Sequence, residues 1–321
     1  MDLFITILLL AAGIVLVVKG GDFFVDAASW IAEVSGIPKL IIGATIVSVA
    51  TTLPEMLVSV IAATQGKVDM SIGNAVGSVT ANLGLIMAIA VICMPGVIKR
   101  KEYLLKSALM LLSCLIVAIC GFVGEVNIIS SAVLLIIFAI FIIENVMEAK
   151  RTILEKPDND NSEEKPATDK KTVTLNIAKF ILGTIGIVVG ADLLVDNGSE
   201  LARIIGVSER IIGVTLVAVG TSLPELITTI TAVAKKQSAL SVGNIIGANI
   251  MDLTLIMPLS ALISGKSLPI ASASAVLDLP VCLIVGAVAI IPAMVSSKFK
   301  RWQGYVLLGI YAVYVVVTCI A

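Results

Sequence analysis

The stretch GATIVSVATTLPEM at residues 43–56, followed by SIGNAVGSVTAN at 71–82, occurs twice in the chain. Its second copy reads GVTLVAVGTSLPEL at 213–226 and SVGNIIGANIMD at 241–252. Both copies lie in apolar runs of membrane-spanning length, where a carboxylate costs at least ~2.5–3.5 kcal/mol to insert. A Thr-Thr/Ser-Leu-Pro-Glu sequence in each copy therefore indicates a functional site.

The composition fixes the class of protein. Of the 321 residues, 58% are hydrophobic and 14% are charged, and the mean hydropathy is +1.09. Soluble domains are about 45–50% apolar. The chain is therefore expected to be an all-α polytopic membrane protein.

Windows of about 19 residues locate the spans, because about 20 apolar residues cross the hydrocarbon core. The first apolar run has no preceding Lys or Arg and no cleavage signature, so we interpret it as a span. Ten transmembrane helices are predicted, at 3–20, 38–64, 70–94, 103–122, 126–147, 173–195, 209–234, 239–263, 270–293 and 302–320.

The basic residues predict the orientation of the spans. Most Lys and Arg residues fall on one face once the spans are drawn, and this face is expected to be cytoplasmic. Both termini are then extracellular and the plasma membrane is the expected location. The hydrophilic segment 148–172 becomes a flexible cytoplasmic linker between a first five-helix repeat, 1–147, and a second, 173–321.

The two halves are related without a gap over roughly seventy residues. The offset is 170, the difference between Asp22 and Asp192, and it also places Glu55 on Glu225 and Asn82 on Asp252. Because each half has an odd number of spans, the second repeat enters the membrane from the opposite side. Inverted repeats of this kind are typical of secondary transporters.

Each repeat places a proline immediately before its glutamate. Pro54 and Pro224 cannot donate to the carbonyl four residues earlier, so helices 2 and 7 are predicted to kink there. Each kink would gather oxygen atoms, which come from one carboxylate and from the hydroxyls of Thr51, Thr52, Thr221 and Ser222.

The following span of each repeat adds polar side chains on one helical face. These are Ser78 and Asn82 in the first repeat and Asn249 and Asp252 in the second. Together with the glutamates they form an all-oxygen set with three acids, which suits hard cations such as calcium or sodium. The chain has no histidine and its five cysteines are dispersed, so a zinc or copper site is poorly supported.

The paired TTLPE/TSLPE and GNAVGS/GNIIGA motifs resemble the two alpha-repeats of the calcium/cation antiporter superfamily, in its sodium/calcium exchanger branch and its compact prokaryotic members. The resemblance covers essentially the whole chain. It implies ten helices, with helices 1 and 6 as a mobile pair across a core of eight, and a central cluster of four sites. Three sodium ions or one calcium ion would occupy these sites in turn.

The resemblance also implies a role for each matching residue. Glu55 and Glu225 become the calcium ligands, helped by Thr51 and Thr221. One sodium position matches Ser48, Thr52 and Ser78, and the other matches Ala218, Ser222 and Ala248–Asn249. Asn82 and Asp252 match a polar midpoint pair.

Two positions depart from this pattern. Ala248 stands where the first repeat has Ser78, which removes a hydroxyl from one sodium position. Asp252 matches an aspartate found in potassium-dependent relatives and in some compact prokaryotic ones, so potassium dependence stays open.

The leading hypothesis is a secondary antiporter that exchanges sodium for calcium by alternating access, electrogenically if three sodium ions move per calcium. Proton/calcium exchange, potassium-dependent exchange and a cation channel are the alternatives. No enzyme activity, cofactor or nucleic-acid partner is expected, and a monomer suffices. The role of Asp278, inside the ninth span beside Pro280, stays open between the ion path and a polar bond within the bundle.

Overall fold

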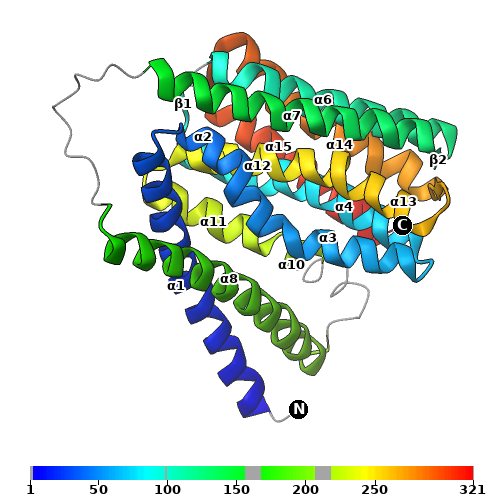
Figure 1. Cartoon of the computed structure of the whole chain (residues 1–321). Coiled ribbons are helices and arrows are strands. Elements are labelled where there is room, and N and C mark those ends of the chain that lie inside the picture. The colour runs from blue at the N-terminus through cyan, green and yellow to red at the C-terminus, as the bar shows by residue number, and fades with distance from the viewer. Residues whose placement is uncertain (1–2, 98–99, 156–167, 207–217, 321) are drawn as a thin grey trace.

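The computed structural model describes residues 3–97, 100–155, 168–206 and 218–320. Over these ranges the chain is helical, as the sequence predicts, apart from four two-residue strands (Figure 1). The helices are α1 (Leu3–Ser35), α2 (Lys39–Ile42), α3 (Ser48–Thr64), α4 (Val68–Ala81), α5 (Ala88–Cys93), α6 (Arg100–Val123), α7 (Ile128–Glu155), α8 (Lys170–Ile204), α10 (Ala218–Thr221), α11 (Leu223–Ala234), α12 (Ser238–Met251), α13 (Met257–Ser264), α14 (Leu279–Ser296) and α15 (Arg301–Ile320). Short π-helical turns precede or join some of them, namely η1 (Gly43–Val47), η2 (Asn82–Met87), η4 (Asp252–Ile256) and η5 (Ser274–Asp278).

Nine continuous helical segments of the described residues are long and apolar enough to cross a membrane. They correspond to nine of the ten predicted spans. The other predicted span, 209–234, begins in 207–217, which lies outside the described residues. Its described part contains the short apolar helix Leu223–Ala234.

The first and sixth predicted spans are longer than the sequence indicated. The apolar windows end at residues 20 and 195, whereas α1 continues to Ser35 and α8 runs from Lys170 to Ile204. The predicted ends were wrong because these helices carry polar residues, such as Asp22, beyond their apolar parts. Lys235, which follows α11, forms a salt bridge with this aspartate and compensates its charge.

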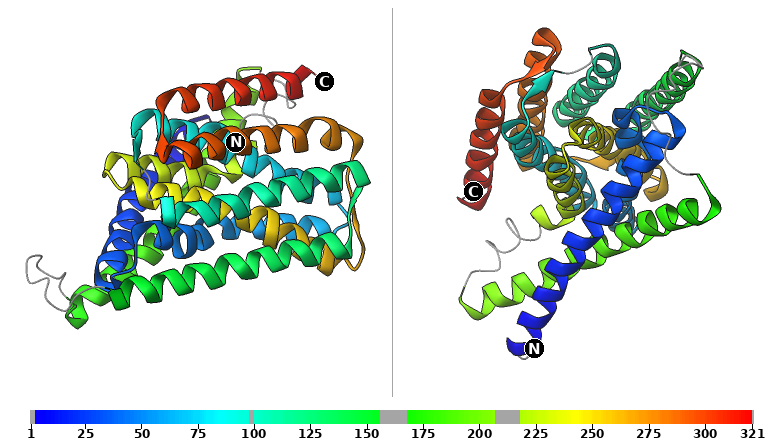
Figure 2. Two further views of the ribbon diagram at one scale, coloured as in Figure 1. Left: turned by 90° about the horizontal axis from the view of Figure 1, so that it is seen from above. Right: turned by 90° about the vertical axis from the view of Figure 1, so that its left-hand side faces the viewer.

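α1 and α8 pack against each other and cross the side of the remaining bundle (Figures 1 and 2). Glycines allow the close approach. A β-carbon on Gly20 would lie 2.9 Å from the carbonyl oxygen of Gly183, and one on Gly13 would lie 3.0 Å from that of Gly190. Because 13 meets 190 and 20 meets 183, the helices run antiparallel at the crossing.

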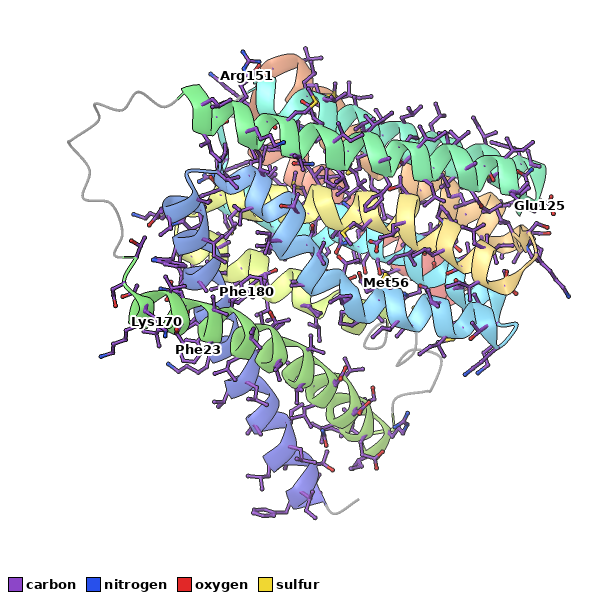
Figure 3. All side chains as sticks on the ribbon, viewed as in Figure 1. Phe23, Met56, Glu125, Arg151, Lys170 and Phe180 are labelled. Atoms are coloured by element: carbon purple, nitrogen blue, oxygen red, sulfur yellow. The ribbon has the colours of Figure 1, made fainter. Side chains whose placement is uncertain are left out.

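An aromatic contact also holds these two helices. Phe24 of α1 stacks on Phe180 of α8, which Figure 3 labels, with the ring centroids 4.7 Å apart. The pairing of segments 1 and 6 that the family resemblance implies is therefore present in the structure.

The centre of the bundle is formed by two repeat-related segments. In the most apolar window of segment 68–93, 72% of the residues are buried, and in that of segment 238–264 the share is 83%. The corresponding share is 22% in both α1 and α8. Gly243 of α12 packs against the backbone of Leu40 and Ala44 so closely that a β-carbon would lie 2.2 Å from the Leu40 carbonyl oxygen. The glycine of the GN-x-x-G motif thus brings the second repeat against the first.

Short strand pairs tie together the connections at opposite ends of the bundle (Figure 1). β1 (Gly96–Val97) pairs antiparallel with β4 (Lys298–Phe299), and β2 (Glu125–Val126) pairs antiparallel with β3 (Leu268–Pro269). Each pair links a connection of the first half to one of the second.

The predicted linker is helical at both of its ends. α7 continues to Glu155, and α8 begins after Asp169, whose carboxylate accepts a hydrogen bond from the Thr172 backbone N–H at 3.2 Å. α6 and α7 are joined by a buried ion pair. Lys106, which is only 1% exposed, forms a salt bridge with Glu148.

Candidate functional site

Glu55 and Glu225 are buried side chains on repeat-related helices. Glu55 lies in α3 and is 1% exposed, and Glu225 lies in the first turn of α11 and is 0% exposed. The prolines before them act differently. α3 continues through Pro54, whereas the second copy is interrupted at Ser222, between α10 and α11, with Pro224 in the first turn of the new helix.

Each glutamate accepts a hydrogen bond from the opposite repeat. The Ser222 hydroxyl donates to Glu55 Oε1 at 3.1 Å, and the Thr52 hydroxyl donates to Glu225 Oε1 at 3.3 Å. Thr52 and Ser222 are themselves related by the 170-residue offset, so the two contacts are reciprocal. The two TTLPE/TSLPE copies therefore meet at one place, with each carboxylate positioned by the other half of the chain.

A third hydroxyl makes the pair unequal. Ser78 of α4 donates to Glu55 Oε1 at 2.7 Å. The residue at the equivalent position of α12 is Ala248, which is fully buried and has no hydroxyl to offer Glu225. Glu55 thus accepts hydrogen bonds from two serine hydroxyls, those of Ser78 and Ser222. Because Ala248 has no hydroxyl, Glu225 lacks the hydrogen bond that would correspond to the one from Ser78.

One of the two predicted midpoint residues, Asn82, makes a contact across the repeats, and its partner is Asn249, which was predicted as part of a sodium position. Asn82 donates through Nδ2 to Asn249 Oδ1 at 3.0 Å, and Asn249 in turn lies 3.8 Å from the sulfur of Met110. Asn82 begins η2, and its repeat mate Asp252 begins η4. A π-helical turn widens the helix locally and is frequent at functional sites.

Several buried oxygens of this region have no hydrogen-bond donor among the described residues. They are one carboxylate oxygen each of Glu55 and Glu225 (Oε2), both carboxylate oxygens of Asp252, and Oδ1 of Asn82. Buried polar atoms nearly always have a partner, so this many unsatisfied acceptors together fit a site for cations. All are hard oxygen ligands.

The three acids do not converge on a single point. In the described part of the chain, no three acidic, cysteine or histidine side chains are close enough to share one metal ion. The geometry therefore favours two carboxylates complemented by hydroxyl and amide oxygens.

The remaining predicted site residues take different places. Thr51 donates to Asn244 Oδ1 at 3.3 Å, and Ser48 donates to the Thr45 carbonyl oxygen of its own helix turn at 3.1 Å. Thr221 lines a cavity beside Glu55. The side chain of Ala218 lies outside the described residues. Asp278, whose role the sequence left open, accepts a hydrogen bond from the Tyr314 hydroxyl at 3.0 Å.

Two asparagines of the site were absent from the predicted set. Asn74 donates to the Glu55 carbonyl oxygen at 3.2 Å and to Ser59 Oγ at 2.9 Å. Asn244 donates to Thr228 Oγ1 at 3.0 Å, while it accepts from Thr51. Their exact recurrence at the 170-residue offset was the available signal, because each is the asparagine of a GN-x-x-G motif.

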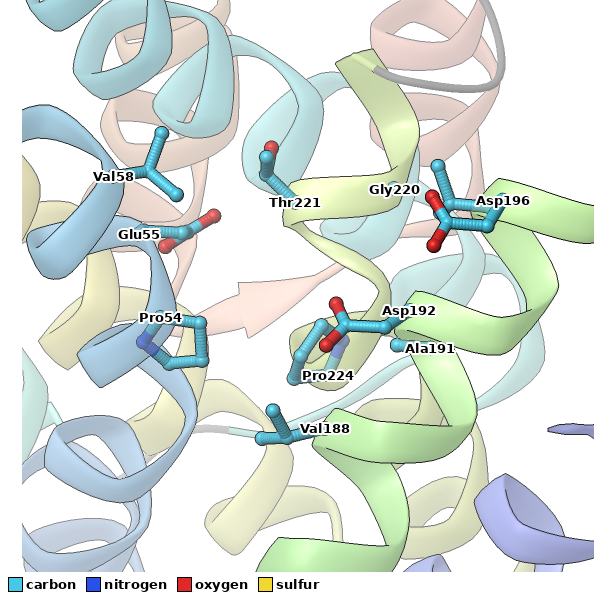
Figure 4. Close-up of a pocket in the computed structure, with 11 residues that line it drawn as sticks. Pro54, Glu55, Val58, Val188, Ala191, Asp192, Asp196, Gly220, Thr221 and Pro224 are labelled. Atoms are coloured by element: carbon cyan, nitrogen blue, oxygen red, sulfur yellow. The ribbon is translucent and has the colours of Figure 1, made fainter. Parts of the chain in front are cut away.

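A cavity of about 220 Å³ opens beside Glu55 (Figure 4). Pro54 and Glu55 of α3 line one side, and Thr221 and Pro224 line another. α8 contributes the third wall, including Asp192 and Asp196. Glu55 points from α3 into this space, so the cavity reaches one of the two buried carboxylates.

A family model described as sodium/calcium exchanger protein matches residues 5–147 and 175–320. The chain is 32% identical over 309 residues to an uncharacterized membrane protein of Methanocaldococcus jannaschii, covering 94% of each sequence. It is 30% identical over 359 residues to the sodium/calcium exchanger MaX1 of Methanosarcina acetivorans, covering 98% of each.

A solved structure is also similar over almost the whole chain. The sodium-calcium exchanger NCX_Mj, soaked with sodium and strontium, superposes with a TM-score of 0.77 at 29% identity, and covers 98% of this chain and 99% of its own. The similarity thus includes both repeats and the region between Glu55 and Glu225.

Proposed function

Because the chain belongs to the sodium/calcium exchanger protein family, we propose that it exchanges sodium for calcium across the plasma membrane by alternating access. Calcium and sodium are its transported ions, and three sodium ions move for each calcium. Each cycle then transfers one net positive charge, so the exchange is electrogenic.

The observation that carries this proposal is the reciprocal bonding of the two buried glutamates. The Ser222 hydroxyl donates to Glu55 and the Thr52 hydroxyl donates to Glu225. Two carboxylates therefore lie at the contact between the two halves. Two carboxylates neutralise one divalent ion, and the hydroxyl oxygens that now donate to them can turn toward a bound cation. Movement of one half relative to the other would remake these contacts.

The ligand sets follow the order of the motifs. Calcium would be bound by Glu55 and Glu225 with Thr51 and Thr221. Sodium would be bound at one position by Ser48, Thr52 and Ser78, and at the other by Ser222, Asn249 and backbone near Ala218. Asn82 and Asp252 would form the midpoint position, in keeping with their unsatisfied buried oxygens.

The membrane arrangement of this proposal is two inverted five-helix repeats, 1–147 and 173–321, joined by the segment 148–172. The antiparallel crossing of α1 and α8 and the reciprocal hydroxyl contacts support it. The excess of Lys and Arg on one face supports a cytoplasmic position for that segment and an extracellular position for both termini. One monomer contains the complete site.

Calcium-45 uptake into proteoliposomes tests the proposal. Vesicles loaded with sodium and diluted into sodium-free buffer should accumulate calcium, and vesicles with sodium on both sides should not. Imposed proton or potassium gradients serve as controls. Uptake driven by protons alone would instead identify a proton/calcium exchanger, and an absolute need for potassium would identify a potassium-dependent one. Calcium flux that needs no counter-ion at all would identify a channel.

A further inference from the structure

Two repeat-related pairs of aspartates lie outside the buried site. Asp22 and Asp26 belong to α1, and Asp192 and Asp196 occupy the equivalent positions of α8. Within each pair the residues are four apart, so both carboxylates lie on one face of the helix with β-carbons about 5–6 Å apart. The structure places these two equivalent pairs in different surroundings.

The α1 pair forms salt bridges with a lysine of the same chain. Lys235, which follows α11, lies with Nζ 2.7 Å from Asp26 Oδ1 and 3.3 Å from Asp22 Oδ1. The same ammonium donates to the Asp22 carbonyl oxygen at 3.0 Å. A pair of aspartates with this spacing is therefore able to bind a positive charge between its members.

The α8 pair has no such lysine from the equivalent position. The residue that corresponds to Lys235 in the first repeat is Gln65, which is uncharged. Asp192 and Asp196 are instead exposed and line the 220 Å³ cavity, opposite Glu55 (Figure 4). Glu55 is 1% exposed, and its Oε2 has no hydrogen-bond donor among the described residues.

We propose that Asp192 and Asp196 form an entry site for the transported cation, where a hydrated divalent ion binds before it reaches Glu55. Two carboxylates at the mouth of a cavity with apolar walls concentrate cations, since such a cavity focuses the electric field. On the α1 side Lys235 occupies the equivalent pair, so the entry site is assigned to the α8 side in this conformation. This inference rests on the proposed function for its substrate, calcium.

Initial rates of sodium-dependent calcium-45 uptake provide the first test. The double variant Asp192→Asn/Asp196→Asn should raise the calcium concentration for half-maximal uptake by up to ~10-fold at low ionic strength, with an unchanged maximal rate. The effect should shrink as salt is added, because exposed charges are screened beyond about 10 Å at 0.1 M. Glu144→Gln, which removes a charge from α7, a helix that does not line the cavity, is the matched control.

A second measurement, the rate of thiol labelling, reports the electrostatic potential in the cavity and does not depend on transport activity. Val188 of α8 also lines the cavity, so Val188→Cys in a background without the native cysteines can be labelled by cationic and anionic methanethiosulfonate reagents. The cationic reagent should react faster, and the preference should fall several-fold when Asp192 and Asp196 become asparagine.

A reagent preference that both asparagines leave unchanged would overturn the entry site, and so would an unchanged half-maximal calcium concentration. Absence of sodium-dependent uptake in the unmodified protein would refute the proposed function instead, while the thiol measurement would still decide whether the aspartates attract cations.

Discussion

Ala248→Ser should strengthen the sodium site that we propose for the second repeat. In the first repeat the Ser78 hydroxyl donates to Glu55 Oε1 at 2.7 Å. The equivalent Ala248 is fully buried and offers no hydroxyl, and Glu225 Oε2 has no donor among the described residues. A serine at 248 would restore the missing oxygen beside Glu225.

The size of the effect follows from one added polar ligand. A hydrogen bond or comparable contact contributes about 1 kcal/mol net, and 1.4 kcal/mol corresponds to a tenfold change in affinity. The sodium concentration for half-maximal exchange should therefore fall by up to about fivefold. The opposite variant, Ser78→Ala, should raise that concentration by a similar factor, because it removes the donor that the first repeat already has.

The assay is calcium-45 exchange at a series of sodium concentrations. Ala248→Cys is the control, since it adds an atom of similar size that is a poor sodium ligand. An identical sodium dependence in Ala248→Ser and the unmodified protein would refute this reasoning, and would mean that Asn249 or backbone oxygens already complete the site.

Three further predictions concern charge, packing and an ion pair. With three sodium ions per calcium, calcium uptake into sodium-loaded vesicles should speed up when a potassium–valinomycin gradient makes the interior positive, since one charge moved through 100 mV is worth about 2.3 kcal/mol; a rate independent of the clamped potential would indicate electroneutral exchange. Gly20→Ala should lower the melting temperature in detergent because its β-carbon would lie 2.8 Å from the Ile187 nitrogen, whereas Gly309→Ala, with no atom within 4 Å, should not; equal melting temperatures would contradict the crossing geometry. Lys106→Met should lower the melting temperature because Glu148 loses its partner. The double variant Lys106→Met/Glu148→Gln should recover most of the loss. A double variant as unstable as the single one would rule out the pairing as the cause.

Hydropathy and the internal repeat predicted much of the fold. The second predicted span, 38–64, corresponds to α2, η1 and α3 together, which end at Thr64. The helix lengths of α1 and α8 were missed because a hydropathy window stops where polar residues become frequent, whereas these helices continue through them. Only the tertiary contact with Lys235 shows how Asp22 and Asp26 are accommodated.

The site was predicted in its residue types more completely than in its contacts. The repeat offset identifies Thr52 and Ser222 as equivalents, but it does not say that each hydroxyl bonds the glutamate of the opposite half. The position of Ser48 shows the same limit. It shares the helix with Glu55, yet its hydroxyl donates to the Thr45 carbonyl oxygen, since serine in a helix readily bonds its own backbone.

Equilibrium binding of calcium-45 to the purified protein tests the central claim that Glu55 and Glu225 together bind the transported calcium. The unmodified protein should bind calcium, and sodium should displace it. Glu55→Gln and Glu225→Gln should each lose that binding while they stay folded, and Glu144→Gln, on α7 outside the cluster, should retain it. Calcium bound by either glutamine variant as tightly as by the unmodified protein would contradict the account.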